Sequence, residues 1–300
     1  MTSMYVPKPV ISLAVQPNDI KSETNMAKAL NRFTKEDPTF TTSVNEETGD
    51  TLISGMGELH LEVYLERMRR EYNAAISVGE PRVAYRETIT RQSAFDYIHK
   101  KQTGGAGQFG RVAGFMEPCS DEEFVFEDQI SGGVIPTHYI PACEKGFREC
   151  MAKGPAFKYP VSGIKVTIND GASHSVDSSE MAFKAAAKGA FRQAYPKAGP
   201  VLLEPVMKVV VETPSEFQGT VMGTLTQRRG IIVGSQDEET SSIIEAQVPL
   251  AEMFGYTTVL RSLTQGKAQF TMEFYAYKQV PQSITEEITK KNEKTSKTGT

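Results

Sequence analysis

Hydrophobic and polar positions in the first 80 residues alternate between the two periods of regular secondary structure. Ile11, Leu13 and Val15 lie on one face of an expected strand, and later apolar residues recur at helical spacing. The expected elements are strand 10–15, helix 22–36, strands 39–44 and 51–53, helix 57–72 and strand 74–78. This βαββαβ order is typical of a split-βαβ, ferredoxin-like domain.

The same order returns near the end of the chain. The expected elements are strand 206–211, helix 215–229, strands 231–233 and 242–248, a helix that begins at Pro249, and strand 267–277. Ser215 and Gln218 have the spacing of a capping box, and Pro249 suits the first position of a helix. The pattern therefore predicts a second ferredoxin-like domain.

The middle of the chain has a different pattern. It predicts a helix over 138–153, a strand over 161–168 and an alanine-rich helix over 179–195. The irregular segments 100–110 and 169–178 interrupt these elements. The whole is an α+β chain of three domains, for which we predict the boundaries 5–80, 81–203 and 204–280, followed by a polar, disordered tail over 281–300.

Composition narrows the class of protein. A net charge of −4 and a pI near 5.7 argue against indiscriminate coating of nucleic acid, so any RNA contact must be local. No apolar run reaches the roughly 20 residues that a membrane helix needs, so no membrane partner is expected. The 3 cysteines and 4 histidines lack the spacing of a metal site.

The first irregular segment holds four glycines between Gly104 and Gly110. Its backbone suits a phosphate cradle, but the frame is neither a P-loop nor a dinucleotide fingerprint, and a flexible hairpin tip is the simpler interpretation. The flanking Lys100, Lys101 and Arg111 favour a polyanionic partner.

The second irregular segment holds His174. A hydrolase triad of Ser173, His174 and Asp177 is one interpretation, but no nucleophile elbow lies nearby. Capping of the following helix by Asp177, Ser178 and Glu180 explains these polar residues more simply, and it leaves His174 free for a contact.

Two other candidates have structural explanations. His60, close to Glu58 and Glu62, is expected at the surface of a first helical turn. Arg228 and Arg229 precede Gly230 at an expected helix C-terminus, where their exposure would also suit rRNA phosphates.

Four motifs, taken in this order, resemble elongation factor G. They are ISGMGELHL at 53–61, QTGGAGQ at 102–108, HSVDSSE at 174–180, and PLAEMFGY at 249–256 with LRSLT at 260–264. The resemblance covers residues 5–277 and implies the family's domains III, IV and V. It implies that the middle domain is similar to domain 2 of ribosomal protein S5, with a left-handed βαβ crossover, and that the two ferredoxin-like domains flank it.

The resemblance also implies an RNA-contacting site. The middle domain of the family enters the A site of the small ribosomal subunit, where its tip loops touch tRNA and mRNA. The tip residues that the resemblance implies are Gly104, Gly105, Ala106, Gly107, Gln108 and His174. Further expected phosphate contacts are Lys100, Lys101, Arg111, Arg228 and Arg229.

Some residues depart from the pattern of the family, and these departures bear on the cellular source of the protein and on its GTPase activity. Ala106 stands where bacterial forms commonly carry Arg, and Glu117-Pro118 is closer to the mitochondrial type, so the mitochondrial matrix is the expected location and the bacterial cytoplasm the alternative. No P-loop or guanine motif occurs, so the GTPase half is expected to be absent from this chain, with no catalytic residue, metal or cofactor of its own. GTP and Mg²⁺ would belong to the full-length factor, a translational GTPase.

The function expected from the resemblance is a monomeric ribosome-binding arm that promotes tRNA–mRNA translocation. Its partners would be rRNA, tRNA and mRNA. A ribosome-recycling or ribosome-protection paralogue is the alternative within the class. A stand-alone hydrolase built on Ser173, His174 and Asp177 is the alternative outside it.

Overall fold

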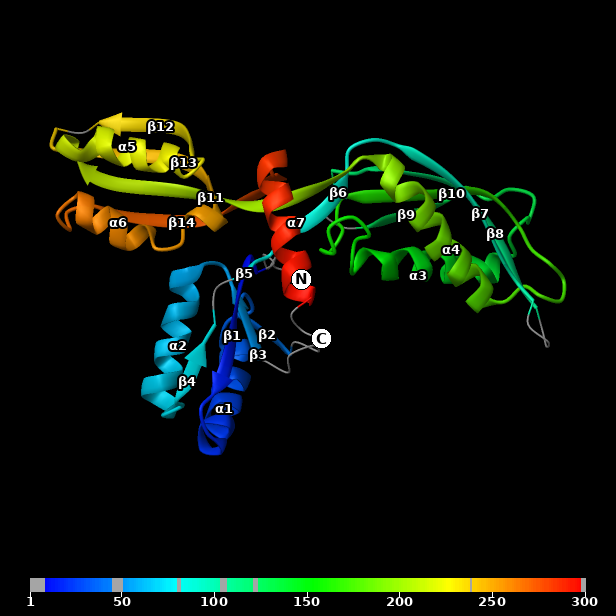
Figure 1. The fold of residues 1–300 in the computed structure, drawn as a ribbon, viewed down its shortest axis with the longest axis horizontal. Helices are drawn as coiled ribbons and strands as arrows, with labels where there is room; N and C mark the ends of the chain where they lie inside the picture. The colour runs from blue at the N-terminus through cyan, green and yellow to red at the C-terminus, as the bar shows by residue number, and fades with distance from the viewer. Residues whose placement is uncertain are drawn as a thin grey trace, which may run out of the picture. The chain divides into compact units, whose positions relative to one another are not determined.

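The computed structural model describes residues 9–44, 51–79, 82–102, 107–120, 124–237 and 239–297. It divides into two compact units, each described by itself. One unit comprises Met1–Ala84 with Glu204–Lys278, and the other comprises Tyr85–Leu203 with Gln279–Thr300. The described residues form three sheets, and Figure 1 shows these sheets with their helices. Among the helices of these ranges, none has the length and hydropathy that a membrane span requires.

The N-terminal fold confirms the first predicted βαββαβ order. Its elements are β1 (Ile11–Pro17), α1 (Ile20–Glu36), β2 (Thr41–Val44), β3 (Thr51–Gly55), α2 (Glu58–Tyr72) and β4 (Ile76–Val78). The sheet order is β2-β3-β1-β4, and the short β5 (Arg82–Val83) also pairs with β1. Asp19 caps α1 by accepting a hydrogen bond from the Ser22 amide.

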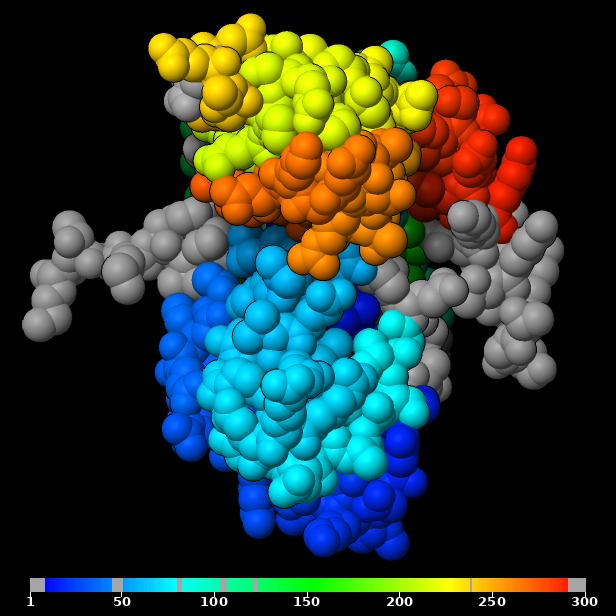
Figure 2. Space-filling view, turned by 90° about the vertical axis from the view of Figure 1, so that its left-hand side faces the viewer, coloured from blue at the N-terminus to red at the C-terminus, as the bar shows by residue number. Residues whose placement is uncertain are grey.

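Alternation along the strands and helical spacing along α1 and α2 bury one apolar core. Its largest fully buried side chains are Phe33, Phe40, Ile11, Ile53, Leu61 and Met68. One face of this fold is seen in blue to cyan in Figure 2.

The C-terminal fold confirms the second βαββαβ order. Its elements are β11 (Pro200–Pro214), α5 (Gln218–Gln227), β12 (Ile231–Asp237), β13 (Ser241–Pro249), α6 (Tyr256–Leu263) and β14 (Gln269–Gln279). The sheet order is β12-β13-β11-β14.

Two details of the C-terminal fold differ from the sequence prediction. Ser215 does not cap α5: residues Ser215–Phe217 form a 3₁₀ turn, and the side-chain amide of Gln218 instead donates to Ser235 and Asp237. Pro249 ends β13, and a 3₁₀ turn at Leu250–Glu252 precedes α6. Ser215 and Pro249 therefore each lie at a short turn before a helix. The helices α5 and α6 themselves begin a few residues later, where their buried apolar residues begin.

Strand β11 runs through the predicted domain boundary near Leu203. Its first part, Pro200–Leu203, pairs with β6 (Arg86–Ile89), and its second part, Val206–Pro214, pairs with β13. Pro205 lies between these two ladders, where its missing N–H interrupts neither of them. Leu202 and Glu204 are both buried, so this stretch is not an exposed linker.

The middle fold contains a four-stranded sheet and two helices that pack together. Its elements after β6 are β7 (Ser93–Lys101), β8 (Gln108–Pro118), β9 (Val125–Asp128), α3 (Ile140–Met151), β10 (Ile164–Ala172) and α4 (Glu180–Ala194). The sheet order is β7-β8-β10-β9, and β9 and β10 are parallel neighbours joined across α3. Buried alanines on α4 allow this helix to approach α3 and the sheet closely.

Strand β10 is longer than the sequence predicts. The expected irregular segment 169–178 begins inside β10, because Asn169, Asp170 and Gly171 are typical of a turn. In the structure, a shift of register between Ile168 and Asp170 absorbs the extra residue, and pairing with β8 continues to Ala172.

Glu87 on β6 is a fully buried carboxylate of the middle fold. One oxygen accepts hydrogen bonds from the amides of Phe157 (2.7 Å) and Tyr159 (3.0 Å). The other oxygen accepts from the Tyr195 hydroxyl at 2.8 Å. Burial, followed by the charge and hydrogen bond of Glu87, raises the pKa of Tyr195. Glu87 therefore holds the loop between α3 and β10 against the end of α4.

The segment after Pro281 differs from the predicted disordered tail. Gln282–Lys297 form helix α7, and the preceding Val280 is buried, with its amide donating to the Leu202 carbonyl. The polar composition suggested disorder, but Glu, Lys and Gln are also strong helix formers, and Ile284 and Ile288 have the i, i+4 spacing of one apolar face.

Candidate functional site

The two irregular segments predicted from the sequence lie against each other at one end of the middle fold. The first lies at the β7–β8 hairpin, where Lys101 pairs with Gln108. Of its predicted tip residues, Gly104, Gly105 and Ala106 are outside the described residues. The second is the loop 173–179, between β10 and α4. We call residues 107–109 and 173–179 together the tip.

Two hydrogen bonds join the two parts of the tip, and a third stabilises the loop 173–179. The Phe109 amide donates to the Asp177 carbonyl, and the Ser178 hydroxyl donates to the Phe109 carbonyl, both at 2.9 Å. The same hydroxyl accepts from the His174 amide at 2.8 Å. A Cβ on Gly107 would lie 2.8 Å from the Asp177 carboxylate, so a larger residue here would require that side chain to move. The tip is thus a clasped pair of loops.

Gln108 is the first residue of β8, and side chains of β7 and α4 contact its amide group. Its amide oxygen lies 2.9 Å from His99 Nε2, and its amide nitrogen contacts Met181 Sδ at 3.7 Å. His99 belongs to β7 and was not singled out by sequence reasoning. The signal for it was available, because alternation places His99 on the same face of β7 as Phe95 and Tyr97.

His174 is 53% exposed and has a defined internal partner set. The amides of Val176 and Asp177 point at its Nδ1, at 3.3 and 3.2 Å. The Asp177 carboxylate lies farther away, 3.5 Å from the same atom. Ser179, rather than Asp177, is the residue that caps α4, since its hydroxyl accepts from the Ala182 amide.

The geometry does not assemble a hydrolase triad. In a triad, a histidine nitrogen accepts the proton of the serine nucleophile. Within the described part of the chain, no hydrogen bond joins Ser173 to His174. The nearby Ser178 hydroxyl instead bonds backbone groups of His174 and Phe109.

Two exposed apolar side chains lie in or next to the tip. Val176 in the loop is 78% exposed and Met181 in the first turn of α4 is 68% exposed. Exposed apolar surface next to hydrogen-bonding groups suits a partner with both flat and polar faces, such as a nucleotide.

The predicted phosphate-contacting cations divide into two groups. Lys100 and Lys101 are exposed at the end of β7 and form no ion pair with any residue in the described ranges. Arg111 instead donates to Asp96 at 2.7 Å and to Asp170 at 2.9 Å. The hydrogen bond to Asp96 is the main cause that raises the pKa of Arg111, and Arg111 in turn lowers the pKa of Asp96.

Arg228 and Arg229 also have internal partners. Arg229, at φ 59°, forms two hydrogen bonds to the buried Glu204 carboxylate, at 2.7 and 2.9 Å, and one to Glu252. Arg228 donates to the Glu252 carbonyl and lies over the Tyr256 ring. An RNA phosphate would have to compete with these partners. The rRNA contacts of Arg111, Arg228 and Arg229 stay predictions.

His60 lies in the first turn of α2, as the sequence predicted, but its side chain is only 24% exposed and both ring nitrogens have internal partners. Its Nδ1 accepts from the Met56 amide at 3.0 Å, and its Nε2 lies 2.8 Å from the Asp37 carboxylate. Burial raises the pKa of Asp37, but hydrogen bonds from Thr39, His60 and Tyr64 outweigh that effect and bring the pKa to about 2. This polar cluster fixes the turn between β3 and α2.

Acid should weaken the N-terminal fold through this cluster. The folded pKa of Asp37, about 2, lies below its ordinary value of 3.8, so its stabilising contribution is complete above about pH 4 and is lost as the pH falls towards 2. We expect Asp37→Asn to be less stable than the parent at pH 7 and nearly equal to it at pH 2. Urea unfolding at pH 7, 4, 3 and 2 tests this, and a constant difference between the two proteins would contradict it.

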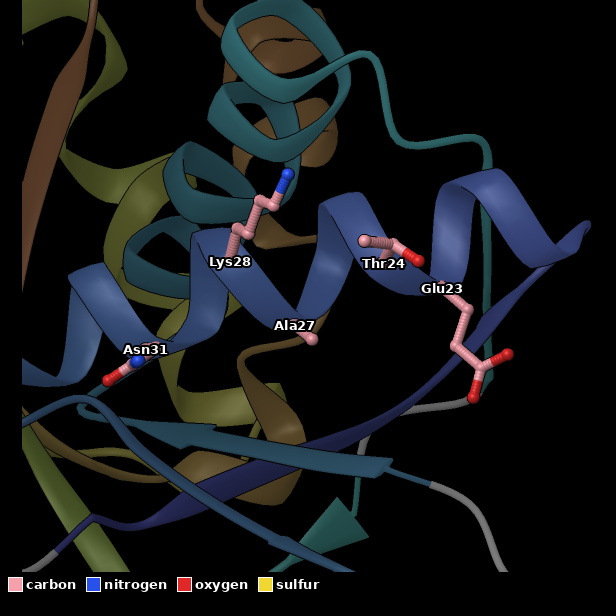
Figure 3. A pocket seen from close by; sticks show the side chains of 5 residues that line it. All are labelled: Glu23, Thr24, Ala27, Lys28 and Asn31. Carbon is pink, nitrogen blue, oxygen red and sulfur yellow. The ribbon is translucent and has the colours of Figure 1, made fainter.

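Two hollows elsewhere lack the features of a chemical site. Glu23, Thr24, Ala27, Lys28 and Asn31 line a shallow hollow of about 580 Å³ on α1, and Figure 3 shows their side chains spreading along the helix rather than pointing to one centre. A second hollow of about 650 Å³ lies between α7 and the start of β11, over Phe157, Leu202 and Val280.

Comparisons with known proteins cover almost the whole chain. The family models for elongation factor G domain III, domain IV and C-terminus match residues 6–80, 81–199 and 201–288. Elongation factor G 1 of Syntrophus aciditrophicus is 70% identical over 96% of this chain and 42% of its own length. Elongation factor G 1 of Desulfotalea psychrophila is 59% identical over 100% of this chain and 43% of its own.

A solved structure from Thermus thermophilus matches with a TM-score of 0.76 and 39% identity, over 97% of this chain and 44% of that one. The chain thus spans less than half the length of the relatives it matches. These relatives are bacterial, so the predicted mitochondrial type and mitochondrial matrix find no support. Ala106 and Glu117-Pro118 were too few positions to separate the two types.

Proposed function

The chain carries domain III, domain IV and the C-terminal domain of the elongation factor G family, and from this premise we propose that it promotes movement of tRNA and mRNA on the ribosome. It would do so as the arm of a translation factor, with the tip of domain IV reaching the A site of the small ribosomal subunit. The relatives named above favour the bacterial cytoplasm as the place of action.

The observation that carries this proposal is the clasped tip. Two segments far apart in sequence present Gln108 and His174 together, and Lys100 and Lys101 lie at the end of the adjacent strand. Hydrogen-bonding side chains near exposed cations suit the sugar–phosphate backbone of RNA. The sheet and α4, which pack behind the tip, would keep the tip in shape when it enters the A site.

GTP and Mg²⁺ enter the proposal only for the full-length factor. The glycine-rich hairpin joins two antiparallel strands, whereas a nucleotide-phosphate loop joins a strand to a helix N-terminus. The described residues of the hairpin therefore do not fit GTP phosphates, and no step of the mechanism in this chain uses them.

Alanine at either tip residue should slow movement and leave stability unchanged. Gln108 and His174 contribute little to the core, so their replacement should change unfolding by no more than ~0.5 kcal/mol. Loss of a net contact worth ~1 kcal/mol would slow tRNA–mRNA movement about fivefold. The test joins the chain to the GTPase half of the Syntrophus relative and compares melting, ribosome-stimulated GTP hydrolysis and movement for Gln108→Ala and His174→Ala.

A matched control is Lys145→Ala, which removes an exposed side chain from α3. It should leave all three readouts near the parent. Normal movement in both tip variants would overturn the proposed role of the tip, and unfolding of His174→Ala would make His174 a structural residue. Loss of ribosome splitting with normal movement would instead indicate a recycling factor.

A further inference from the structure

Gln108 has its hydrogen-bonding polarity fixed by a residue behind it. The amide oxygen of Gln108 can only accept a hydrogen bond, so His99 Nε2, 2.9 Å away, must carry the proton. Because its oxygen accepts from His99, the Gln108 side chain directs its NH₂ group away from His99. There the group meets only Met181 Sδ at 3.7 Å among the described residues, and a thioether is a weak acceptor.

The sheet explains how His99 reaches Gln108. In the β7–β8 ladder, His99 is directly opposite Gly110, and Gln108 is the diagonal neighbour on the same face. Glycine at 110 leaves room for the imidazole to lean along the strand towards the tip, while the first turn of α4 closes the face above it: a Cβ on Gly110 would lie 3.3 Å from the Ala182 carbonyl. His99 is half-buried in this space.

His174 shows the same polarity. Two backbone amides point at its Nδ1, at 3.3 and 3.2 Å, and both lie nearer than the Asp177 carboxylate at 3.5 Å. These two donors are satisfied when Nδ1 is unprotonated and Nε2 carries the proton. No residue in the described ranges hydrogen-bonds that Nε2. Each tip side chain therefore uses its acceptor atom in a hydrogen bond within the protein and presents an N–H donor to a partner.

We propose that His99 is a positioning residue that fixes Gln108 as a hydrogen-bond donor, so that the tip recognises acceptor oxygens of a nucleic-acid backbone. Phosphate and ribose oxygens occur at every nucleotide, and donors aimed at them read no base sequence. A tip that presents hydrogen-bond donors to these oxygens binds RNA of any sequence. This inference rests on the proposed function, because it assumes that Gln108 contacts RNA.

The test uses the same full-length fusion and substitutions at His99. His99→Phe keeps a ring of similar size but removes the N–H, and it should slow tRNA–mRNA movement about fivefold, as Gln108→Ala does. The double variant His99→Phe/Gln108→Ala should be no slower than Gln108→Ala alone, because both act through one contact. His99→Gln can still donate through its amide and should stay within about twofold of the parent. Ile98→Ala, on the opposite face of β7, is the control and should move tRNA at the parent rate.

A second readout does not depend on translation. Nitrogen-15 NMR of the histidine rings in this chain should show His99 in the Nε2–H form, and Gln108→Ala should shift that resonance. An Nδ1–H form, or slowing by His99→Phe that multiplies with the effect of Gln108→Ala, would overturn the positioning role. If His99→Phe moves normally while Gln108→Ala is slow, the positioning role is wrong and the proposed function stands. If Gln108→Ala also moves normally, the donor role of Gln108 is wrong whatever the NMR result.

Discussion

Glu87→Ala should lower the free energy of unfolding of the middle fold by about 3–5 kcal/mol. The substitution leaves three donors without their acceptor, namely the amides of Phe157 and Tyr159 and the hydroxyl of Tyr195. Each buried, unsatisfied donor costs about 1–3 kcal/mol, and water entering the space left by the side chain would recover part of the sum. The measurement is urea unfolding with hydrogen exchange of the α4 amides as the probe. This probe reports the change in the free energy of unfolding of the middle fold separately from the other folds.

Two conservative variants test the cause. Tyr195→Phe removes a single hydrogen bond to Glu87 and should cost about 1–2 kcal/mol. Glu87→Gln keeps the shape and one carbonyl acceptor, and should fall between Tyr195→Phe and Glu87→Ala. A loss below about 1 kcal/mol in Glu87→Ala would show that the loop before β10 does not depend on this carboxylate.

Arg229→Met should destabilise the C-terminal fold by about 3–5 kcal/mol. Arg229 is the two-point partner of Glu204, whose side chain is only 4% exposed, so its removal leaves a carboxylate buried without a counter-charge. The double variant Arg229→Met/Glu204→Leu removes both charges and should recover most of the loss. Chemical unfolding followed by exchange of the β13 amides is the measurement.

This pair of variants also separates the structural role of Arg229 from the predicted rRNA contact. A stable double variant that binds ribosomes like the parent assigns the arginine to the fold. A stable double variant with weakened, less salt-dependent ribosome binding supports the phosphate contact. An Arg229→Met variant as stable as the parent would contradict the structural role.

The repeated helix and strand elements were predictable because their burial follows a short period. Ile11, Leu13 and Val15 alternate in the sequence, and they are buried in β1. The position of the tip segments was predictable for a related reason: glycine and polar residues interrupt the periodic pattern at 100–110 and 169–178.

The internal partners of polar residues were not predictable. Ser178 bonds Phe109, which is 69 residues away in the chain, and Glu87 bonds Tyr195 across 108 residues. A lone glutamate on a short strand is normally expected to face solvent, and the local sequence around Glu87 contains no signal for its distant donors. The internal partners of Arg228 and Arg229 were not predictable either, because the groups that bind these arginines come from other elements.

Strand β11 gives the chain a mechanical property. Its first residues are held by β6 and its later residues by β13, in antiparallel ladders along one covalently continuous strand. A pull along that strand loads the hydrogen bonds of each ladder in shear, all at the same time, rather than opening them one after another. Within each fold, a pull along β11 would therefore have to break a whole ladder at once, which anchors the strand against tension along its own axis.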